Sequence, residues 1–327
     1  MSHTTLKPAA APTGAAASGE GPRSASGARR GRQPRAIPYT LLAPAAVVLA
    51  VVVGYPLVRL VLISFHDYGL RSLFTGVSPW AGFANYTAVF HSADLVPMLV
   101  RTALFCLALA AATLVIGMSC ALIMKSLGKR MRSLMVFSLI TAWAMPNIAA
   151  TLLWTWLFQP TYGVVNWLLT QTHLFGDLRQ HDWTASAVSG LFMVWLLVVW
   201  QSVPFVAVTL YAGVSQVPAE YYEAAELDGA GYFRRFRVVT VPFLRPVLLL
   251  VAMMSVIWDF NVFNQIWLLT AGGPHGGTST LVVWAFTKAF ASQSYGQGAA
   301  IAVLSTALLT VMMWYYVRRM VHAGEGL

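Results

Sequence analysis

The chain has 327 residues, of which 58% are hydrophobic and only 10% are charged. Soluble domains usually carry about 25% charged residues. This deficit, together with a mean hydropathy of +0.66, excludes an ordinary soluble domain and indicates an integral membrane protein. The formal net charge of +10 would suit a nucleic-acid-binding protein, but the positions of the basic residues favour a different explanation, which is given below.

Residues 1–36 consist mainly of Ala, Gly, Ser and Pro with clustered Arg. Such a composition cannot bury a hydrophobic core, so we predict a disordered cytoplasmic tail. Arg29 and Arg30 form a twin-arginine pair. The apolar run that follows them is too long for a cleaved signal peptide, and we therefore predict that it stays in the membrane as the first span.

Six apolar runs follow in chain order, at 41–65, 98–124, 133–158, 186–213, 244–270 and 298–317. Each is long enough to cross a hydrocarbon layer about 30 Å thick as a helix, and helices satisfy their own backbone in lipid. The predicted fold class is therefore an all-α integral membrane protein with six transmembrane helices. The predicted transmembrane domain spans 37–321, and 322–327 form a short cytoplasmic tail.

The Lys and Arg residues alternate in number from one loop to the next. The N-terminal stretch carries six and the segment 125–132 carries four, whereas the loops 66–97, 159–185 and 271–297 carry one each. Basic residues concentrate on the cytoplasmic side of membrane proteins. We therefore predict a multi-pass plasma-membrane protein with both termini in the cytoplasm, and we do not expect nucleic acid as a partner.

The longest cytoplasmic loop, between the fourth and fifth runs, contains the sequence EYYEAAELDGAGYFRRFRVVTVP at 220–242. Its Glu and Ala residues after Pro218 favour a short surface helix that ends near Gly229 or Gly231. Two interpretations are open at this point. The helix either lies on the bilayer while its arginines hold anionic lipid, or it is a docking surface for another protein.

The spacing within this loop resembles the EAA loop of importer-type ABC permeases, which reads EAA, three residues, Gly, nine residues, aliphatic, one residue, aliphatic, Pro. In that family a short helix inserts into a cleft of the ATPase subunit and passes ATP-driven closure of the ATPase dimer to the membrane spans. The resemblance implies that a coupling helix lies in this loop. The implied coupling residues are Glu223, Ala224, Ala225, Asp228, Gly229 and Pro242.

The sequence WDFNVFNQIWLLTAGGP at 258–274 is similar to the signature of maltose-type carbohydrate-importer permeases. Together with similar patterns at 54–56 and 295–304, the resemblance covers about 38–319. It implies the permease subunit of an ABC importer for a di- or oligosaccharide. The implied partners are an ATPase dimer, a second homologous permease and an extracytoplasmic sugar-binding protein. A weaker resemblance points to actinobacterial disaccharide importers, including those for N,N'-diacetylchitobiose.

Asp259 is the one ionisable residue near the middle of the fifth run, and intramembrane charge by default suggests a functional site. On a continuous helix, Asn261, Asn264 and Gln265 would occupy a second face, suited either to the pathway or to hydrogen bonds between helices. Matched to the family, the substrate-facing positions are Gln201, Ser202, Phe205, Ser255, Trp258, Asp259 and Val262. Asp259 departs from the family, which often has Asn there, so an alternative is that it pairs with Arg59 or another buried group.

No phosphate-binding G-x-x-x-x-G-K-[ST] motif occurs, and the seven His residues are isolated from one another. We therefore expect a non-catalytic membrane subunit without a cofactor or metal, whose energy comes from ATP hydrolysis by a separate ATPase. The alternative is a secondary transporter driven by an ion gradient. It would need paired intramembrane acids or an Asp–Arg relay, and it would leave the EAA spacing unexplained.

Overall fold

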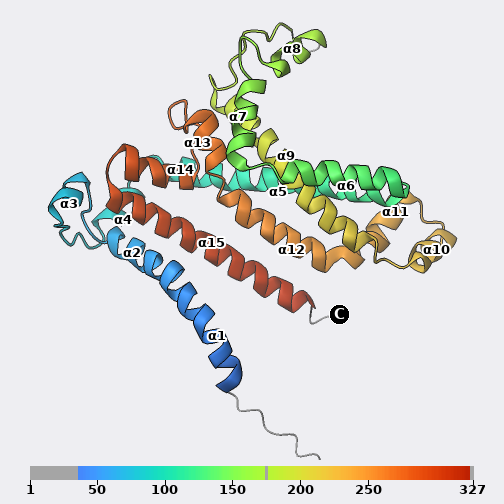
Figure 1. Cartoon of the computed structure of the whole chain (residues 1–327), viewed down its shortest axis with the longest axis horizontal. Coiled ribbons are helices and arrows are strands. Elements are labelled where there is room, and N and C mark those ends of the chain that lie inside the picture. The colour runs from blue at the N-terminus through green and yellow to red at the C-terminus, as the bar shows by residue number, and fades with distance from the viewer. Residues whose placement is uncertain (1–35, 174–175, 325–327) are drawn as a thin grey trace, which may run out of the picture. The chain divides into compact units, whose positions relative to one another are not determined.

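The computed structural model describes residues 36–173 and 176–324, which are almost entirely helical and contain no β-sheet strand (Figure 1). The chain divides into two compact units, Met1–Gly54 and Tyr55–Leu327. The described part of the first unit comprises helix α1 (Ala36–Leu49) and the π-helical turn η1 (Ala50–Gly54). The predicted disordered tail lies outside the described residues, except for Ala36, which begins α1.

The second unit is organised around two long helices that pack along each other, α5 (Leu95–Ser126) and α9 (Ala187–Val214). Gly117 of α5 lets the two backbones approach, because a Cβ atom there would lie 2.6 Å from Cγ1 of Val206 in α9. Small residues allow this kind of close contact between membrane helices. Side chains such as Leu109 and Leu197 are fully buried along this contact.

The remaining elements of the second unit are also helical, and several of them contact α5 or α9 while α2 and α4 contact α15 (Figure 1). In chain order they are α2 (Tyr55–Ser64), α3 (Leu70–Thr75), α4 (Ala84–Phe90), α6 (Lys129–Trp143), α7 (Asn147–Leu157), α8 (Val164–Gln171), α10 (Ala219–Leu227), α11 (Tyr232–Arg235), η2 (Phe236–Thr240), α12 (Val241–Phe260), α13 (Asn264–Thr270), α14 (Leu281–Phe286), η3 (Thr287–Ala291) and α15 (Tyr295–Gly324).

Five helical runs in the described residues are long and apolar enough to cross a membrane, and a bent pair of helices raises the number to six if the pair counts as one span. The five runs are Leu42–Ser64, Leu95–Ser126, Ala187–Val214, Tyr232–Thr270 and Tyr295–Arg318. The predicted all-helical membrane fold is confirmed. The number six stays a prediction, because it depends on how the bent pair is counted.

The third apolar run, at 133–158, is not one straight helix. It consists of α6 and α7, which meet at an angle of 95°. The break contains Pro146, which has no backbone N–H to donate and disfavours helical conformation at Met145 before it. Figure 1 shows α7 and α8 standing away from the long helices of this unit.

The fifth apolar run is also interrupted, where an uninterrupted helix over 244–270 was predicted. Helix α12 ends at Phe260 and α13 begins at Asn264. At its N-terminal end this run is longer than predicted, because α11, η2 and α12 continue one another from Tyr232. Helix α15 reaches Gly324, three residues into the predicted tail 322–327, of which 325–327 lie outside the described residues.

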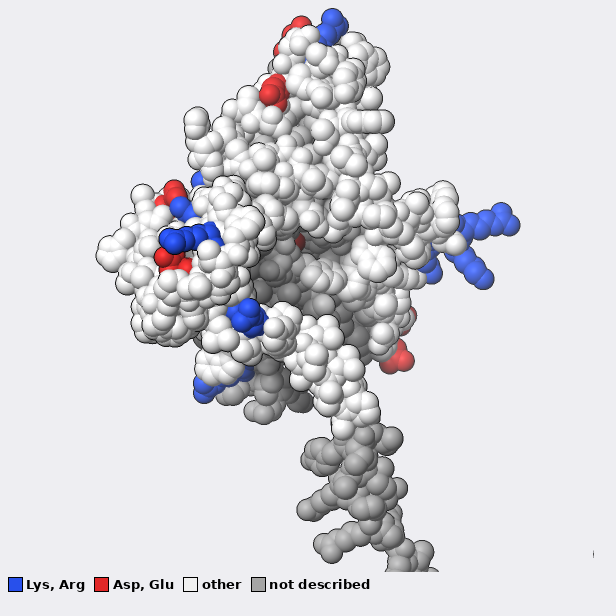
Figure 2. Space-filling view, turned by 60° about the vertical axis from the view of Figure 1, so that its left-hand side comes forward, with Lys and Arg blue, Asp and Glu red and all other residues white. Residues whose placement is uncertain are grey.

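Charged side chains occupy few places on the surface. Figure 2 shows Lys, Arg, Asp and Glu in small groups, with wide uncharged areas between them. Many large apolar side chains of the long helices are exposed in the chain by itself, for example Leu104, Leu107 and Val311. This pattern is expected for helices whose outer faces contact lipid or another membrane subunit.

Candidate functional site

Helix α10 has a sharply defined end. The N–H of Gly229 donates to the carbonyl of Glu226 at 2.9 Å, and the N–H of Ala230 donates to the carbonyl of Ala225 at 2.9 Å. These two bonds form a Schellman motif, in which the residue after the cap adopts a left-handed conformation. Gly229 has a φ of +73°, which glycine adopts at no steric cost. The predicted short helix in the 220–242 loop therefore ends at the first of its two candidate glycines.

Most of the coupling residues predicted in and directly after α10 are solvent-exposed, and Glu223 also lines a cavity between α10 and the rest of the unit. Glu223, Ala224, Asp228 and Gly229 are exposed, and Ala225 is half-buried. Next to them, Leu227 has 90% of its surface exposed. This segment is therefore open to solvent in the chain by itself.

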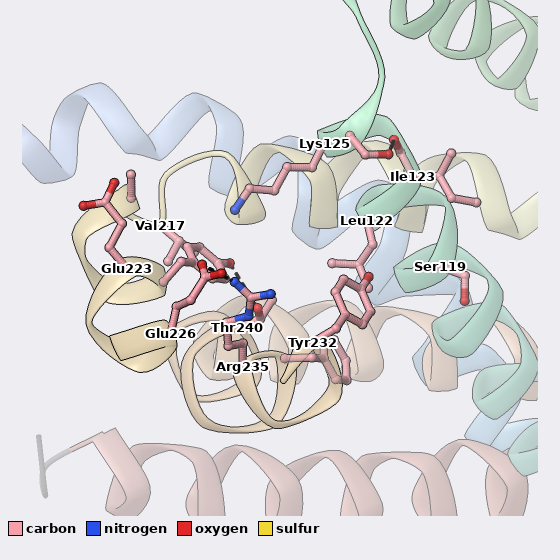
Figure 3. A pocket seen from close by; sticks show the side chains of 14 residues that line it. Ser119, Leu122, Ile123, Lys125, Val217, Glu223, Glu226, Tyr232, Arg235 and Thr240 are labelled. Carbon is pink, nitrogen blue, oxygen red and sulfur yellow. Dashed lines mark hydrogen bonds and ion pairs between the residues drawn. The ribbon is translucent and has the colours of Figure 1, made fainter. Parts of the chain in front are cut away.

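Other side chains attach α10 to the membrane helices (Figure 3). The hydroxyl of Tyr222 lies 3.0 Å from that of Thr240 in η2, and Lys125 Nζ lies 3.8 Å from the centroid of the Tyr222 ring. Arg235 of α11 donates to Glu226 at 2.7 Å. A cavity of about 960 Å³ lies between α10, η2 and the end of α5. Sequence reasoning missed Lys125 and Tyr222, although Tyr222 lies within the quoted loop.

Pro242 does not interrupt the helix that leads into the fifth apolar run. It lies near the start of α12, which continues the π-helical turn η2 without a gap. Because Pro242 has no N–H, the hydrogen bond to the residue four positions earlier is missing. The wider π-helical turn directly before it, in which the N–H of Val241 donates to the carbonyl of Phe236, accommodates this gap. The helix therefore carries on from the loop into the membrane.

A second candidate site is a cavity of about 430 Å³ at the point where both interrupted spans break. It lies beside the α6–α7 bend and the α12–α13 break, and α9 supplies the wall between them. Its polar lining comprises Asn147, Gln201, Ser202, Asp259, Asn261, Asn264 and Gln265, and its aromatic lining comprises Trp143, Trp258 and Phe263.

The interruption after Phe260 corrects the prediction of two separate faces on the fifth span. On a continuous helix, Asn261 would point away from Asp259, but the break turns the chain so that both residues line the same cavity. Gln201, Ser202, Trp258 and Val262, which were predicted to face the pathway, also line it.

Two predicted pathway residues lie outside the lining of this cavity. Ser255 is buried within α12, one turn before Asp259. Phe205 packs behind the cavity wall, with its ring centroid 5.1 Å from that of Trp258 and 6.3 Å from that of Trp143. Phe205 therefore fixes the orientation of the lining aromatic rings without lining the cavity itself.

A chain of side-chain amides joins three helices across the cavity. Gln265 Nε2 in α13 donates to Gln201 Oε1 in α9 at 3.2 Å, and Gln201 Nε2 donates to Asn147 Oδ1 in α7 at 3.1 Å. Sequence reasoning did not select Asn147. A polar residue directly after a proline in an apolar run was the available signal for it.

Asp259 has 5% of its surface exposed, and its Oδ2 atom has no hydrogen-bond partner. Arg59, the suggested partner, is exposed and forms no ion pair with it. Among the side chains that the structure describes, the one ion pair is Arg235–Glu226. The same side chains include no group of three His, Cys, Asp or Glu that could hold a metal. A buried carboxyl oxygen without a hydrogen bond is costly in free energy.

Residues 113–320 match the family model described as "Binding-protein-dependent transport system inner membrane component". The chain belongs to this family. It is therefore a multi-pass plasma-membrane permease component of an ABC importer, and the separate ATPase of such a system hydrolyses the ATP, as the sequence analysis predicted.

Three relatives match most of this permease. It is 42% identical to the diacetylchitobiose uptake system permease protein DasB of Streptomyces coelicolor, over 86% of this chain and 85% of the relative. It is 32% identical to the sulfoquinovosyl glycerol transport system permease protein SmoG of Agrobacterium fabrum, over 87% and 90%. It is 30% identical to the trehalose/maltose transport system permease protein MalF of Thermococcus litoralis, over 86% and 92%.

The fold also resembles that of a solved importer. A bacterial ABC transporter that imports the acidic polysaccharide alginate contains a chain that matches with a TM-score of 0.72 and 16% identity, covering 88% of this permease and 95% of that chain. At this identity the match supports the fold alone, and it agrees with the described helices.

Proposed function

We propose that the chain is the permease subunit through which an ABC importer moves a di- or oligosaccharide, of the N,N'-diacetylchitobiose type, into the cytoplasm. The observation that carries the proposal is the exposed helix α10. A solvent-facing EAA helix that is anchored to a membrane span gives an ATPase a surface to bind. The sugar class is supported by the names of the three relatives, above all by DasB at 42% identity.

In this proposal α10 is the cytoplasmic contact for an ATPase dimer, and one continuous helix carries its movement to the cavity. Tyr222 and Glu226 tie α10 to Thr240 and Arg235. From Thr240 the helix runs without a gap to Asp259 at the cavity, a distance of about 28 Å at 1.5 Å per residue. Closure of the ATPase dimer that displaces α10 would therefore tilt or shift the cavity wall itself.

The cavity has the chemistry that a sugar requires. The exposed ring of Trp258 can stack on the C–H face of a pyranose, while the amides of Asn147 and Gln201 and the carboxyl group of Asp259 can bond its hydroxyl groups. A pocket of this kind between broken membrane helices is also where other transporters place their substrates. A second homologous permease would complete the pathway, and an extracytoplasmic sugar-binding protein would deliver the sugar.

We also propose that both termini lie in the cytoplasm, since the basic residues of the alternating loops favour that orientation. The secondary-transporter alternative is less well supported. It needs a partner for the buried carboxyl group, and Asp259 has no ion-pair partner in the described residues. The family match supports transport by a binding-protein-dependent system instead.

Uptake of labelled disaccharides tests the proposal in cells with and without this chain, after depletion of ATP and, separately, after collapse of the proton gradient. We expect deletion to abolish uptake of one sugar. ATP depletion should have the same effect, and collapse of the proton gradient should not. Uptake that is lost on collapse of the proton gradient and survives depletion of ATP would contradict the proposed ATP-driven import.

A further inference from the structure

A continuous row of aromatic rings leads away from the membrane cavity. In order along the row, its members are Phe263, Trp267, Phe286, Phe290, Tyr295 and Tyr68. Each ring centroid lies between 4.8 and 6.1 Å from the next one, which is the range for aromatic side chains in contact. The first ring, that of Phe263, lines the cavity, so the row and the cavity are continuous.

The row is assembled from segments that are far apart in the sequence. Its four middle rings belong to α13, α14, η3 and the start of α15, which lie close to one another (Figure 1). The last ring comes from the loop after α2, where the carbonyl of Tyr68 accepts a hydrogen bond of 3.0 Å from the N–H of Gly296. The row therefore joins the cavity to the loops 66–97 and 271–297. Each of these loops carries one basic residue, and both lie outside the cytoplasm in the proposed topology.

The six rings keep part of their surface open in the chain by itself. Phe290 is 58% exposed, and the other five residues are half-buried. Phe263 and Trp267 pack against the hydrophobic cluster that contains Leu109 and Leu197, and this packing leaves them partly accessible. The row therefore offers aromatic surface to a molecule that enters or leaves the cavity.

A second group of aromatic rings does not have this continuity with the cavity. It comprises Trp154, Phe158, Trp183, Phe192, Trp195 and Trp200, and none of these six residues lines the cavity. Aromatic side chains also form belts at membrane interfaces, but a belt places its rings at the level of the lipid headgroups. The row that begins at Phe263 starts inside the fifth apolar run and ends in loops between runs.

We propose that this row is an aromatic track along which the sugar moves between the extracytoplasmic side and the cavity. The inference rests on the proposed function and adds the route by which the sugar reaches the cavity. A pyranose can pack the C–H groups of its face on an aromatic ring. Such packing depends less on direction than a hydrogen bond does, so successive rings offer similar contacts and none holds the sugar strongly. Because the rings contact one another, a disaccharide can reach the next ring before it leaves the last.

The test uses the complete importer in liposomes with its binding protein, and it measures uptake of labelled N,N'-diacetylchitobiose. Phe290→Leu removes the most exposed ring and keeps an apolar side chain, whereas Phe290→Trp keeps an aromatic ring. The matched control is Phe192→Leu, which removes a ring that is 46% exposed from the second aromatic group. For each variant, three quantities are determined: the maximal uptake rate, the concentration of loaded binding protein that gives half of it, and ATP hydrolysis without sugar.

In Phe290→Leu we expect the maximal uptake rate to fall about two- to tenfold, the range for the loss of one aromatic contact. Phe290→Trp should retain about half of the wild-type rate or more, and Phe192→Leu should not differ from the wild type. Co-purification of the ATPase and ATP hydrolysis without sugar should stay at the wild-type level in all three variants, because neither position lies in or near α10 in the sequence.

Unchanged uptake in both Phe290→Leu and the inner variant Phe286→Leu would overturn the aromatic track and leave the proposed sugar import standing. An equal loss in Phe290→Leu and Phe290→Trp would also overturn it, because the aromatic ring would then not be the property that matters. A change confined to the concentration of binding protein at half-maximal uptake would assign Phe290 to contact with that protein and not with the sugar. Failure of the wild type to take up the sugar would overturn the proposed sugar class and, with it, the track.

Discussion

At position 229 glycine is needed for its backbone conformation and not because a larger side chain would lack space. Its φ is +73°, and a Cβ atom added there would meet nothing within 4 Å. Gly231, two residues later, has the same free space but an ordinary φ of −64°. Gly231 therefore serves as a control, because alanine can adopt its φ without strain whereas alanine at Gly229 cannot.

We expect Gly229→Ala to weaken coupling and Gly231→Ala to leave it unchanged. A left-handed conformation costs an L-residue about 1–2 kcal/mol, which reduces the population of the correctly ended α10 by about fivefold or more. Co-purification of the ATPase and sugar uptake should both fall in Gly229→Ala, while the amount of membrane-inserted protein stays constant. Equal behaviour of the two variants would show that the left-handed turn is not needed for coupling.

At the scale of elements, two contacts connect α10 to the helix that leads to the cavity, and they differ in strength. The Tyr222 hydroxyl bonds that of Thr240, whose side chain is only 2% exposed. The Arg235–Glu226 ion pair is more exposed, with Glu226 at 66%. A buried polar group that loses its partner costs about 1–3 kcal/mol, whereas a surface ion pair contributes about 0–1 kcal/mol.

Removing the first contact should therefore uncouple the importer more than removing the second. In Tyr222→Phe we expect the number of ATP molecules hydrolysed per sugar transported to rise severalfold, because α10 moves without carrying α12 with it. In Arg235→Gln the ratio should change little. Measurement of both rates in the reconstituted importer gives this ratio, and a larger effect for Arg235→Gln would reverse the ranking.

At the scale of the whole molecule, α10 and the break between α12 and α13 lie at different ends of α12 (Figure 1), and the cavity lies beside that break. The proposed mechanism therefore requires α10 to lie in the cytoplasm and the α7–α8 segment to lie on the other side of the membrane. The loop that contains α8 carries one basic residue, Arg179, whereas the segment 125–132 carries four.

A reporter enzyme that is active only outside the cytoplasm tests this orientation. We expect activity when it is inserted between 176 and 185, and none when it is fused after residue 327 or inserted at Lys129, since the basic segments stay inside. Activity of the C-terminal fusion would contradict the proposed topology and would place α10 on the wrong side for an ATPase.

The sequence by itself determined the membrane class, the approximate bounds of the apolar runs, and the position of the loop helix. Composition and periodicity carry these features, because lipid requires long apolar helices with no unpaired backbone groups. The EAA spacing and the WDFNVFNQIWLLTAGGP signature at 258–274 also identified the family before any fold was known. Each of these features depends on residues that are close together in the sequence.

Only the tertiary structure decided which polar residues meet. Helical periodicity placed Asn261 and Asp259 on different faces, but the break after Phe260 puts both in one cavity. The bend at Pro146 places Asn147 in the same cavity, and the sequence does not specify its angle of 95°. Lys125 reaches Tyr222 across almost a hundred positions of sequence. Periodicity describes a helix only as far as it continues, so contacts made beyond a break depend on how the separate segments pack.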